Sequence, residues 1–581
     1  MADISTIRHS LAHILAMAVL KLWPDAKLAF GPATEDGFYY DFDLQEKISE
    51  KELLKIAEKM EEIIKEGHSF VQDFLSPSEA KKVFKNQPYK LEQIEKIIAE
   101  GEKQISVYKT ADFIDLCKGP HVKSTKECGA FKLVQVAGAY WLGSEKNPML
   151  QRIYGVAFAT KEELEAHLKL LAEAKLRDHR KLGAALGLFL FSDLVGPGLP
   201  LYTPLGTRLR NQIVKFSREL RESIGYQEVT TPQINKIDLF RVSGHLEKYA
   251  ENMFGVSSHY SQKQYFLKPM NCPQHIQIYA SNQRSYKDLP IRFADFSFIY
   301  RDEKMGELLG LSRLRAFSQD DGHCFCRPDQ LETEFSRLFS VIDKAMQAYD
   351  FAYRLRLSLR DPKKQKEYLG DEALWQQAES LMRKLLKERG VNFTEAPGEA
   401  AFYGPKVDLI VKDSLQREWQ LSTIQLDFNM PKRFGIYYID ENAKKQTPIM
   451  IHSAIVGSPE RLMAMLLEHY AGALPFWLAP LQMVLLPVSE KFLSSAQKIN
   501  SRLQKEGFFT ELWQEDSLSR RIRQAEILKV PVMLVLGEKE KKANLLNLRL
   551  REQKEQFSIS LQELIREAKE ALCKREKSLS F

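Results

Sequence analysis

Two pairs of side chains suited to metal binding or acid–base chemistry recur at one spacing in the N-terminal part of the sequence. His9 and His13 stand at i and i+4 in "HSLAH", so on a helix both imidazoles would project from one face. Cys117 and His121 have the same interval in "DLCKGPH". If the four converge, they could hold a metal ion. They could equally form a metal-free hydrolytic pocket, in which histidine and aspartate position a water and a lysine stabilises charge. The residues leave both alternatives open.

A further cysteine and histidine stand three residues apart in "FLKPMNCPQHIQ". Cys272 and His275 could belong to a metal site, could be a nucleophile with its base, or could be a core cysteine beside an unrelated histidine. The local spacing does not decide between these readings, because each chemical role needs partners from elsewhere in the chain.

Charged, aromatic and amide side chains alternate in "YRDEKMGELLGLSRLRAFSQDDGHCFC". Arg301 and Glu303 would share one strand face. After a glycine-bearing loop, one face of the next strand would present Arg313, Arg315, Phe317, Gln319, Asp321 and His323. Arginine binds phosphate oxygens in bidentate geometry, and a flat aromatic ring can stack on a base. The run therefore predicts a nucleotide site, although the sequence has no GxxxxGK[ST] loop.

The elements that must position these groups are predicted by periodicity and turn residues. Helices are expected at 5–22, at 49–66 with Ser49 as N-cap, and at 160–183. "GFYYDFDL" and "ISVYKTADFIDLC" each read as a strand, and helices alternate with β-rich runs from 205 to 475. The last hundred residues alternate strands (481–488, 508–513, 531–537) with helices (490–506, 517–529), then give two short strands and a closing helix. This order predicts an α+β multidomain protein.

Composition limits the class of protein. A length of 581 residues predicts three or four domains. Six scattered cysteines without a repeated spacing argue against a disulfide framework and fit a reducing cytosol. The N-terminus lacks the features of a signal peptide, and no run of about 18 apolar residues predicts a membrane span. We therefore expect a cytoplasmic protein whose net charge of +7 permits an anionic partner such as RNA.

Several short motifs, in unbroken order over nearly the whole chain, resemble one enzyme family. "SIGYQEVTTPQI", "FIYRDE…RLRAFSQDD" and "IVGSPERL" are similar to motifs 1, 2 and 3 of class II aminoacyl-tRNA synthetases. "HSLAH", "GFYYDFD", "DLCKGPH", "SGHLEKY", "LKPMNCPQH", "AFYGPKVD", "STIQLDF" and "KVPVMLVLGEKE" resemble threonyl-tRNA synthetases in particular. By this resemblance we expect the chain to start at the editing domain, without the small extra N-terminal domain of many relatives, and we expect aminoacylation to survive without it.

The resemblance implies a domain plan. Residues 1–160 would form an α+β editing domain, and residues 161–185 a linker helix. Residues 186–478 would form a class II catalytic domain built on an antiparallel sheet. Residues 479–581 would form an α/β anticodon-binding domain. The implied partners are tRNA(Thr), ATP, L-threonine and, through motif 1, a second copy of the chain in a homodimer.

The resemblance also implies one Zn²⁺ per subunit, held by Cys272, His323 and His452, with His275 set aside. Such a zinc would take the amino nitrogen and hydroxyl of threonine, which valine cannot match. An apolar pocket alone separates these isosteres only by roughly a hundredfold. Serine differs from threonine only by a missing methyl group, which lowers its binding free energy by about 1–3 kcal/mol. Some serine would therefore also be activated. A second, hydrolytic site for seryl-tRNA is therefore expected.

Family motifs assign roles in adenylate formation. Arg301 would hold the α-phosphate, Glu303 would read the adenine amino group and Phe317 would stack on the ring. Arg313 and Arg461 would contact the outer phosphates together with Mg²⁺. The remaining assignments border threonine, its activated carboxyl or ATP, and comprise Gln319, Asp321, Tyr403, Lys406, Gln420 and Gln425. His245 is a candidate for assisting transfer to the terminal ribose.

The same resemblance assigns the editing and anticodon sites. Tyr40, Lys90 and Asp115 would join the N-terminal histidines and cysteine. The full editing set is His9, His13, Tyr40, Lys90, Asp115, Cys117 and His121. Glu538, Arg549 and Arg551, the two arginines alternating on a strand, would contact the anticodon.

Three rival functions follow from parts of the same pattern. A synthetase-like RNA-binding paralogue would be favoured by loss of Arg301, Arg461 or a zinc ligand, and all are present. A free-standing editing hydrolase would need only residues 1–155. A class II synthetase for serine, proline or alanine would not need the zinc triad. The sequence therefore favours threonine–tRNA ligation with editing.

Overall fold

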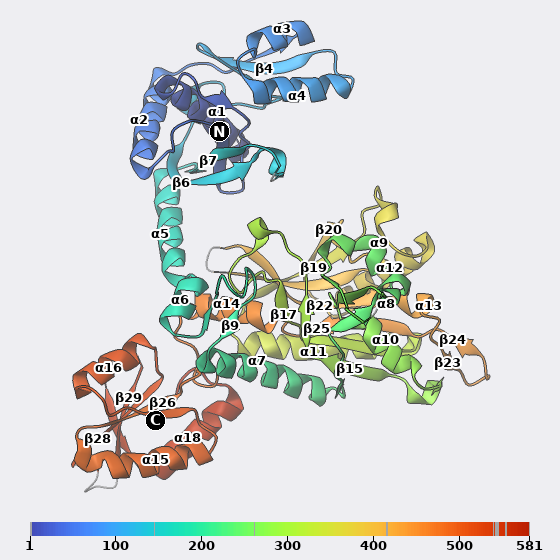
Figure 1. Cartoon of the computed structure of the whole chain (residues 1–581), viewed down its shortest axis with the longest axis vertical. Helices are drawn as coiled ribbons and strands as arrows, with labels where there is room; N and C mark the ends of the chain where they lie inside the picture. Colours follow the sequence, from blue (N-terminus) through green and yellow to red (C-terminus); the bar gives the residue numbers. More distant parts are fainter. Residues whose placement is uncertain are drawn as a thin grey trace. The chain divides into compact units, whose positions relative to one another are not determined.

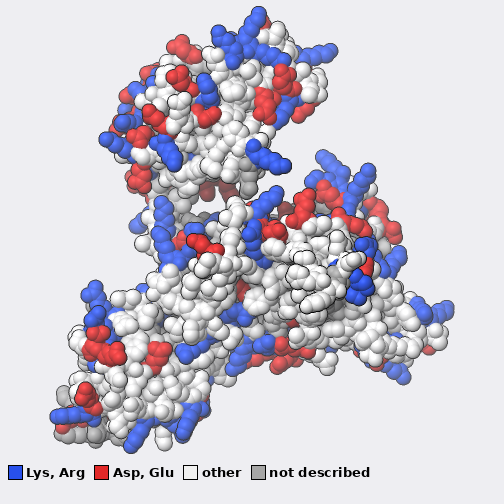
Figure 2. Space-filling model, viewed as in Figure 1, with Lys and Arg blue, Asp and Glu red and all other residues white. Residues whose placement is uncertain are grey.

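The computed structural model describes residues 3–144, 146–260, 262–413, 416–538, 540, 545–551, 553 and 555–579. The chain divides into two compact units, Met1–Ala172 and Glu173–Phe581 (Figure 1). All six cysteines are unpaired. Within the described residues, no helix has both the length and the apolar character needed to cross a bilayer. Figure 2 shows basic and acidic side chains interspersed on the face in view.

The first unit packs two helices on a four-stranded antiparallel sheet. Helix α1 forms because apolar residues recur at helical spacing, and Leu11, Ile14 and Leu15 are fully buried. Helix α2 begins at a capping box between Ser49 and Glu52. Both predicted helices are confirmed. The elements of this layer are α1 (Ile4–Leu22), α2 (Glu50–Glu66), and the sheet β1 (Lys27–Leu28), β2 (Gly37–Asp43), β7 (Met149–Phe158) and β6 (Ala130–Tyr140).

A second, three-stranded sheet in this unit carries Cys117. The prediction of one strand over "ISVYKTADFIDLC" is wrong, because the chain reverses at Ala111, whose φ is +50°. The two halves pair as an antiparallel hairpin, and Cys117 and His121 follow its second strand. The elements are β3 (Val71–Leu75), α3 (Pro77–Val83), α4 (Pro88–Ala99), β4 (Ile105–Thr110) and β5 (Phe113–Leu116).

The predicted helix at 160–183 is two helices rather than one. Helix α5 (Lys161–Arg177) crosses the boundary between the units, and α6 (His179–Ala185) begins the second. The break falls at Asp178, whose carboxylate accepts the backbone N–H of Arg180 at 2.9 Å and so caps α6.

An eight-stranded sheet forms the centre of the second unit. All its strand pairs are antiparallel except the two outermost pairs, β10 with β15 and β19 with β20. In sheet order the strands are β10 (Gln227–Glu228), β15 (Ile291–Asp295), β18 (Asp321–Cys326), β25 (Ile449–Ala454), β22 (Glu418–Asp427), β21 (Lys406–Lys412), β19 (Tyr353–Leu359) and β20 (Phe393–Pro397). This confirms the predicted antiparallel catalytic fold.

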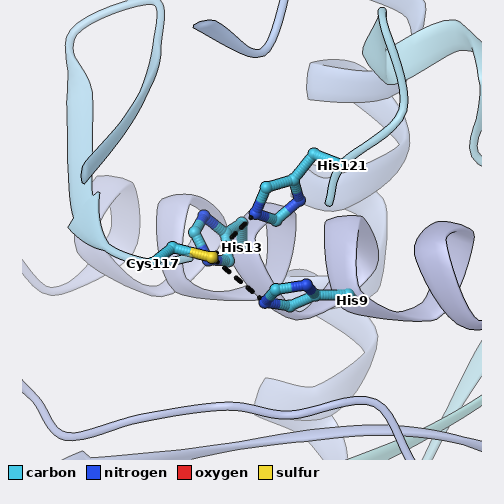
Figure 3. Close-up of side chains that lie close together, drawn as sticks. All are labelled: His9, His13, Cys117 and His121. Carbon is cyan, nitrogen blue, oxygen red and sulfur yellow. Dashed lines mark hydrogen bonds between the residues drawn. The ribbon is translucent and has the colours of Figure 1, made fainter. Parts of the chain in front are cut away.

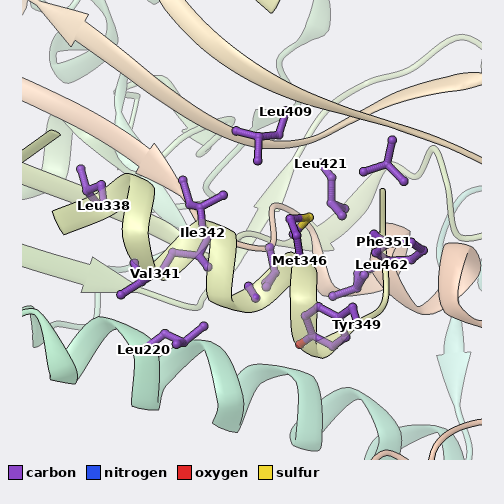
Figure 4. Close-up of a cluster of buried hydrophobic side chains, with 14 of the residues drawn as sticks. Leu220, Leu338, Val341, Ile342, Met346, Tyr349, Phe351, Leu409, Leu421 and Leu462 are labelled. Carbon is purple, nitrogen blue, oxygen red and sulfur yellow. The ribbon is translucent and has the colours of Figure 1, made fainter. Parts of the chain in front are cut away.

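Four helices among the described residues pack around the main hydrophobic core of this unit. Figure 4 shows α11 between the strands that carry Leu409 and Leu421 and helix α7, which carries Leu220. Ile342 and Met346 on α11 are fully buried, since the apolar stripe of the helix faces both layers. The helices are α7 (Pro204–Ser223), α11 (Leu331–Ala348), α12 (Glu372–Glu388) and α14 (Pro459–His469).

A buried ion pair interrupts the strand predicted to run from Arg313 to Cys326. Arg221 on α7 donates from Nε to Asp320 at 2.9 Å, and both side chains are at most 1% exposed. The other carboxylate oxygen of Asp320 accepts the N–H groups of Ile455 and Val456. Because Asp320 turns into the core, the run splits into β17 (Ala316–Ser318), paired with β16 (Phe298–Tyr300), and β18. The first residues of the segment 455–462 are thereby tied to α7.

The C-terminal strands and helices confirm the predicted α/β domain. Three strands are parallel and two more add antiparallel to one edge, in the order β27-β26-β28-β29-β30. The elements are β26 (Met483–Pro487), α15 (Leu493–Lys505), β27 (Thr510–Leu512), α16 (Leu518–Ile527), β28 (Val532–Leu536), β29 (Leu546–Leu550), β30 (Gln556–Ile559) and α18 (Leu561–Lys574).

Candidate active and editing sites

Sheet register brings the central candidate residues into one row. His323 on β18 lies directly opposite His452 on β25, and His452 lies opposite Gln425 on β22. Gln425 in turn lies opposite Lys406 on β21. Side chains opposite one another on antiparallel strands are neighbours on one face. Four predicted residues from four strands therefore share one surface of the sheet.

Two adjoining cavities open on this surface, and Arg301 lines both. The first, of about 240 Å³, contains the predicted nucleotide residues Glu303, Arg313, Phe317 and Arg461. The second, of about 290 Å³, contains most of the other predictions. Its predicted members are Cys272, Gln319, Asp321, His323, Tyr403, Lys406, Gln420, Gln425 and His452. Gln420, assigned to ATP from the sequence, faces this second cavity, while its backbone carbonyl accepts from Arg461 at 3.2 Å.

The first cavity has an aromatic floor and cationic walls. The guanidinium of Arg301 lies 5.3 Å from the ring centre of Phe317, and that of Arg461 lies 5.3 Å from the ring of Trp419. Trp419 was not predicted from the sequence. Burial, together with Arg301 and Arg313, lowers the pKa of Arg461 to about 10. An anion in this cavity would relieve repulsion among three arginines.

Arg313 and Glu303 are paired with each other. The Arg313 Nε donates to Glu303 at 2.9 Å, and the same guanidinium bonds Glu307 at 2.7 Å. A ligand that takes an adenine amino group and outer phosphates would need to exchange these contacts for its own. Arg315, predicted on the same face, instead donates to the carbonyl of Glu303 at 2.9 Å and does not line the cavity.

The second cavity is built from buried polar groups. The Tyr403 hydroxyl donates to Gln425, and the Lys406 ammonium donates to Asp408 at 2.6 Å and to Gln420 at 3.2 Å. Burial raises the pKa of Asp321, whose carboxylate would gain from an ammonium ligand. The cavity therefore offers hydrogen-bond partners for a small zwitterion.

Three predicted ligands converge in this cavity. Donor atoms of Cys272, His323 and His452 all lie within 4.8 Å of one another, and all three residues are buried. The residues come from the start of α10 (Cys272–Ala280), from β18 and from β25. A thiol and two imidazoles suit zinc, and three protein ligands leave a coordination position open. The donor set fits the ion that the sequence implied.

The partners of each imidazole support this fit. The Nε2 of His452 lies 3.1 Å from Asp427, a carboxylate that can only accept, so the proton is on Nε2. The lone pair of His452 Nδ1 faces Nε2 of His323 at 3.0 Å, so both nitrogens point to the place where a metal would bind. The Nδ1 of His323 lies 2.7 Å from the Nδ1 of His275. The Nε2 of His275 lies 3.8 Å from Asp295. With these partners, His323 can direct Nε2 toward the cavity.

His275 has a structural part in the site that the sequence did not predict. From the sequence, His275 was rejected as a metal ligand. Among the described residues, it is not one of those whose donor atoms converge with Cys272. It nevertheless contacts His323, one of the three proposed ligands, and is fully buried. Partners of this kind fix the tautomer and ring orientation of metal-binding histidines. No local sequence signal predicts this contact, because His323 lies 48 residues further along the chain.

His245, predicted as a candidate in tRNA transfer, is fully buried at the start of α9 (His245–Lys248). Its Nδ1 lies 2.8 Å from the Ser243 hydroxyl, and its Nε2 lies 3.3 Å from the sulfur of Met270. Burial, with His452 and Arg301 nearby, lowers its pKa to about 3. The ring is therefore neutral near pH 7, and its role stays a prediction.

The N-terminal histidines and cysteine also converge (Figure 3). His9 and His13 project from α1 toward Cys117 and His121, which follow β5. The Sγ of Cys117 lies 3.3 Å from Nε2 of His9 and 3.2 Å from Nε2 of His121. All four donor atoms lie within 4.8 Å of one another.

Hydrogen bonds orient two of these rings toward the thiol. His9 Nδ1 faces the carbonyl of Pro120 at 3.2 Å, so it carries the proton. Ser10 donates to the carbonyl of Thr6, so its oxygen must accept from Nδ1 of His121 at 3.0 Å. Both Nε2 lone pairs therefore point at Cys117. One thiol proton can satisfy only one of them, which leaves an acceptor for a water or a metal ion.

A buried ion pair of Lys90 and Asp115 lies next to His13. Asp115 accepts from the Tyr40 hydroxyl at 2.6 Å and pairs with the Lys90 ammonium, which also donates to Tyr40 at 2.9 Å. The Nε2 of His13 lies 3.9 Å from Asp115. All seven residues predicted for the editing site thus form one connected cluster.

Burial also makes this pocket sensitive to acid. It lowers the pKa of His13 well below the usual value, and that of His121 to about 2, with His13 and His9 as further causes. In the unfolded chain His121 binds a proton below about pH 6.5, whereas in the folded protein it stays neutral until the pH approaches 2. The free energy of unfolding is therefore unaffected by His121 above pH 6.5 and falls as the pH drops toward 2. The loss is about 2 kcal/mol at pH 5.

We expect this loss to appear in hydrogen exchange of metal-free protein. Amide protection in α1, corrected for intrinsic rates, should fall from pH 7 to pH 5. The C-terminal domain from residue 479 onward contains no histidine and supplies an internal control. Equal loss of protection in α1 and in α18 would contradict the assignment of the effect to His13 and His121.

The residues predicted for the anticodon differ in their surroundings. Glu538 is exposed after β28, and Arg549 lies within β29. The prediction that Arg551 continues this strand is wrong, since β29 ends at Leu550. The Arg551 guanidinium instead donates to the carbonyls of Lys529, Ala473 and Leu474. It links the C-terminal domain to the end of the catalytic domain, and its role in tRNA binding stays a prediction.

Three families of domains match the chain. Residues 254–470 match the "tRNA synthetase class II core domain (G, H, P, S and T)". Residues 482–571 match the "Anticodon binding domain", and residues 105–154 match the "Threonyl and Alanyl tRNA synthetase second additional domain". These ranges contain the row of active-site residues, the C-terminal sheet and the hairpin that carries Cys117.

Whole-chain comparisons agree with these matches. The chain is 46% identical to a threonine–tRNA ligase of Thermotoga neapolitana, with 99% of this chain and 89% of the relative covered. Its structure is similar to that of the "RNA binding domain of Threonyl-tRNA synthetase" from Cryptosporidium parvum. That similarity has a TM-score of 0.65 at 38% identity and covers 70% of this chain and 99% of the other. A threonyl-tRNA synthetase structure described as putative, from Aeropyrum pernix, gives a TM-score of 0.61 at 27% identity over 69% and 98% of the two chains. With this identity over nearly its whole length, the chain belongs to the threonine–tRNA ligase family of class II aminoacyl-tRNA synthetases.

Proposed function

We propose that this chain attaches L-threonine to tRNA(Thr) through threonyl-adenylate and hydrolyses seryl-tRNA(Thr) in its N-terminal unit. The observation that carries the first activity is the position of Arg301, which lines both adjoining cavities. A carboxylate held in one cavity and an α-phosphate held in the other would meet at this guanidinium. Reactant groups held together in this way need no further ordering to react.

Adenylate formation moves charge from the attacking carboxylate to the departing pyrophosphate. Arg301 is placed to stabilise this charge, and the Nε of its guanidinium is buried without a protein hydrogen-bond partner. Phe317 supplies a stacking face, and Arg313 and Arg461 suit the outer phosphates with Mg²⁺. Lys406 and Gln319 would hold the carboxyl oxygens. Asp321 would receive the ammonium group.

We further propose that Cys272 Sγ, His323 Nε2 and His452 Nδ1 hold one Zn²⁺. When bound, it would supply coordination positions that an amino nitrogen and a hydroxyl can fill together, and valine lacks the hydroxyl. Asp427 and His275 hold the two imidazoles in the required orientation. Tyr403 stacks on His452 with ring centres 4.7 Å apart and closes one side of the cavity.

For editing, a histidine lone pair in the N-terminal pocket would accept a proton from water as it attacks the seryl ester. His13 and His121 are neutral near pH 7, so each ring keeps one lone pair, while the lowered pKa values make both rings weaker bases than free imidazole. Lys90 balances the charge of Asp115, which would otherwise be buried alone. A metal ion on the same four donors is the alternative, and metal analysis of the protein would decide it.

The remaining proposals concern assembly, boundaries and location. Exposed apolar residues on the paired strands β8 (Phe189–Leu190) and β9 (Leu201–Tyr202), and in the loop between them, support a homodimer. Leu194 is fully exposed and Val195 is 42% exposed. We retain the domain limits 1–160, 161–185, 186–478 and 479–581, and a cytoplasmic location, as proposals.

The adenylation site is tested by replacing Arg301. In Arg301→Gln, threonine-dependent ATP–pyrophosphate exchange should fall in kcat by about 10²–10³-fold, as expected for loss of a group that stabilises developing charge. Arg354→Gln is a matched control, because Arg354 pairs with Glu418 on an exposed strand surface. A loss below threefold in Arg301→Gln, or an equal loss in both variants, would refute the site.

A further inference from the structure

One buried histidine lies outside both proposed sites, in a cluster with Asp178 and Glu468. His179 begins α6 and is 1% exposed. Its Nδ1 lies 2.8 Å from the carboxylate of Glu468, on the last turn of α14. Its Nε2 lies 3.1 Å from the backbone nitrogen of Leu311. The ring thus spans from α14 to the loop of the motif 2 region.

These partners fix the protonation of the ring. The N–H of Leu311 can only donate, so Nε2 of His179 must be the acceptor. Its proton is therefore on Nδ1 and is donated to Glu468. Both ring nitrogens are used, which leaves no imidazole lone pair for a metal ion. The cluster is a hydrogen-bonded bridge rather than a third metal site.

The bridge ends on the turn that borders the nucleotide cavity. Leu311 lies at the tip of a tight turn, in which the N–H of Ser312 donates to the carbonyl of Leu309 at 2.9 Å. The carbonyl of Ser312 accepts from Nε of Arg461 at 3.0 Å. Leu311, Ser312 and Arg313 all line the cavity of about 240 Å³. His179 and Arg461 therefore each bond the backbone of the turn that presents Arg313.

The fit between ring and turn is close. Gly310 has a φ of +49°, and a Cβ atom there would lie 2.2 Å from Nε2 of His179. Arg461 stands in the first turn of α14 and Glu468 in its last turn. One helix therefore carries both the group that bonds Ser312 and the group that bonds His179. Glu468 is itself 5% exposed, which keeps water from replacing the bond to His179.

We propose that His179 is a positioning residue for ATP. It holds the turn Leu309–Arg313 in the position in which Arg313 and the backbone of Ser312 border the nucleotide. The bridge gives α6, the second helix of the segment 161–185, a direct part in shaping the adenylation site. This inference rests on the proposed placement of ATP in that cavity.

The two ring nitrogens can be tested separately in the full chain. Glutamine at position 179 can place its Oε1 near the position of Nε2 and accept from Leu311. Asparagine can replace only the donor near Nδ1. In ATP–pyrophosphate exchange, we expect His179→Ala and His179→Asn to raise the KM for ATP by about tenfold, on the scale of one buried hydrogen bond. His179→Gln should stay within about threefold, and the KM for threonine should stay within twofold in all three.

Equal KM values for ATP in the glutamine and asparagine variants would overturn the proposal, and this comparison decides even if the alanine variant does not fold. An equal rise in both KM values with a lower Tm would also overturn it, because that pattern marks general destabilisation. Phe317→Ala separates this inference from the proposed site. If that variant leaves the KM for ATP unchanged, the ATP placement is wrong. If it raises that KM and His179→Ala does not, only the positioning role fails.

Discussion

Replacing Cys272 by serine is expected to prevent binding of the proposed Zn²⁺ and to weaken the preference for threonine over valine. In the proposed site the Cys272 thiolate is one of three protein ligands. Loss of a residue that merely supports a metal ligand already costs about 10–100-fold in affinity or activity. Zinc should fall from one per chain to below about 0.1, and threonine activation should fall by at least about 100-fold. A site that binds a substrate hydroxyl directly rejects the analogue that lacks it by about 10⁴-fold. In the variant this ratio should fall to about 100-fold or less.

The matched control is Cys326→Ala. Cys326 is fully buried on β18, two residues from Cys324 and on the face of the strand opposite His323. The Cys326→Ala variant should retain bound zinc and the preference for threonine over valine, even if its Tm drops. A Cys272→Ser variant that keeps both the metal and a 10⁴-fold preference would contradict the ligand assignment.

Replacing His13 by alanine should separate editing from aminoacylation. The ring is buried and neutral, beside Asp115 and across from Cys117 and His121. Loss of a positioned general base typically costs about 10²–10⁴-fold. Hydrolysis of seryl-tRNA(Thr) should fall by this factor, while threonine activation changes less than twofold. Seryl-tRNA should then accumulate when serine is supplied in excess.

His68→Ala is the control for this experiment. His68 lies in the same unit but bonds Glu66 at 2.6 Å and is not part of the converging cluster. It should hydrolyse seryl-tRNA at the rate of the unchanged chain. If His13→Ala and His9→Ala both retain full hydrolysis, the pocket does not perform editing. If threonine activation falls in parallel, the effect is not local to the N-terminal unit.

Most of the fold follows from local sequence signals. The helices at α1, α2, α15, α16 and α18 and the strands of the C-terminal domain lie where periodicity and caps predict them. Errors arose where a single residue redirects the chain. Ala111 turns a predicted strand into a hairpin, Asp178 ends one helix and caps the next, and Asp320 breaks a strand by joining Arg221. Such local breaks depend on partners far away in sequence.

The candidate sites were predicted through motif order rather than from physical reasoning on single residues. "HSLAH" with "CKGPH" did give a convergent pocket from spacing alone, because i, i+4 positions on α1 face one side. The zinc triad could not be derived that way. Cys272, His323 and His452 meet only through the register of β18 with β25 and the packing of α10 against them.

Supporting residues were the least predictable part. His275 and His179 carry no local signal for the residues they contact, since each bonds a group on a strand or loop tens to more than a hundred residues away. Arg551 looked like an RNA-contacting strand residue, but its guanidinium is used by three backbone carbonyls. Burial and hydrogen-bond partners, which a sequence does not state, decide such roles.

The most direct test is X-ray absorption at the zinc edge of the full chain, measured without an amino acid, with threonine and with valine. We predict one sulfur at about 2.3 Å and two imidazole nitrogens at about 2.0–2.1 Å. Adding threonine should add two light-atom ligands and change the spectrum, whereas valine should leave it unchanged. A protein without stoichiometric zinc, a shell lacking sulfur, or the same spectrum with threonine and valine would contradict the account.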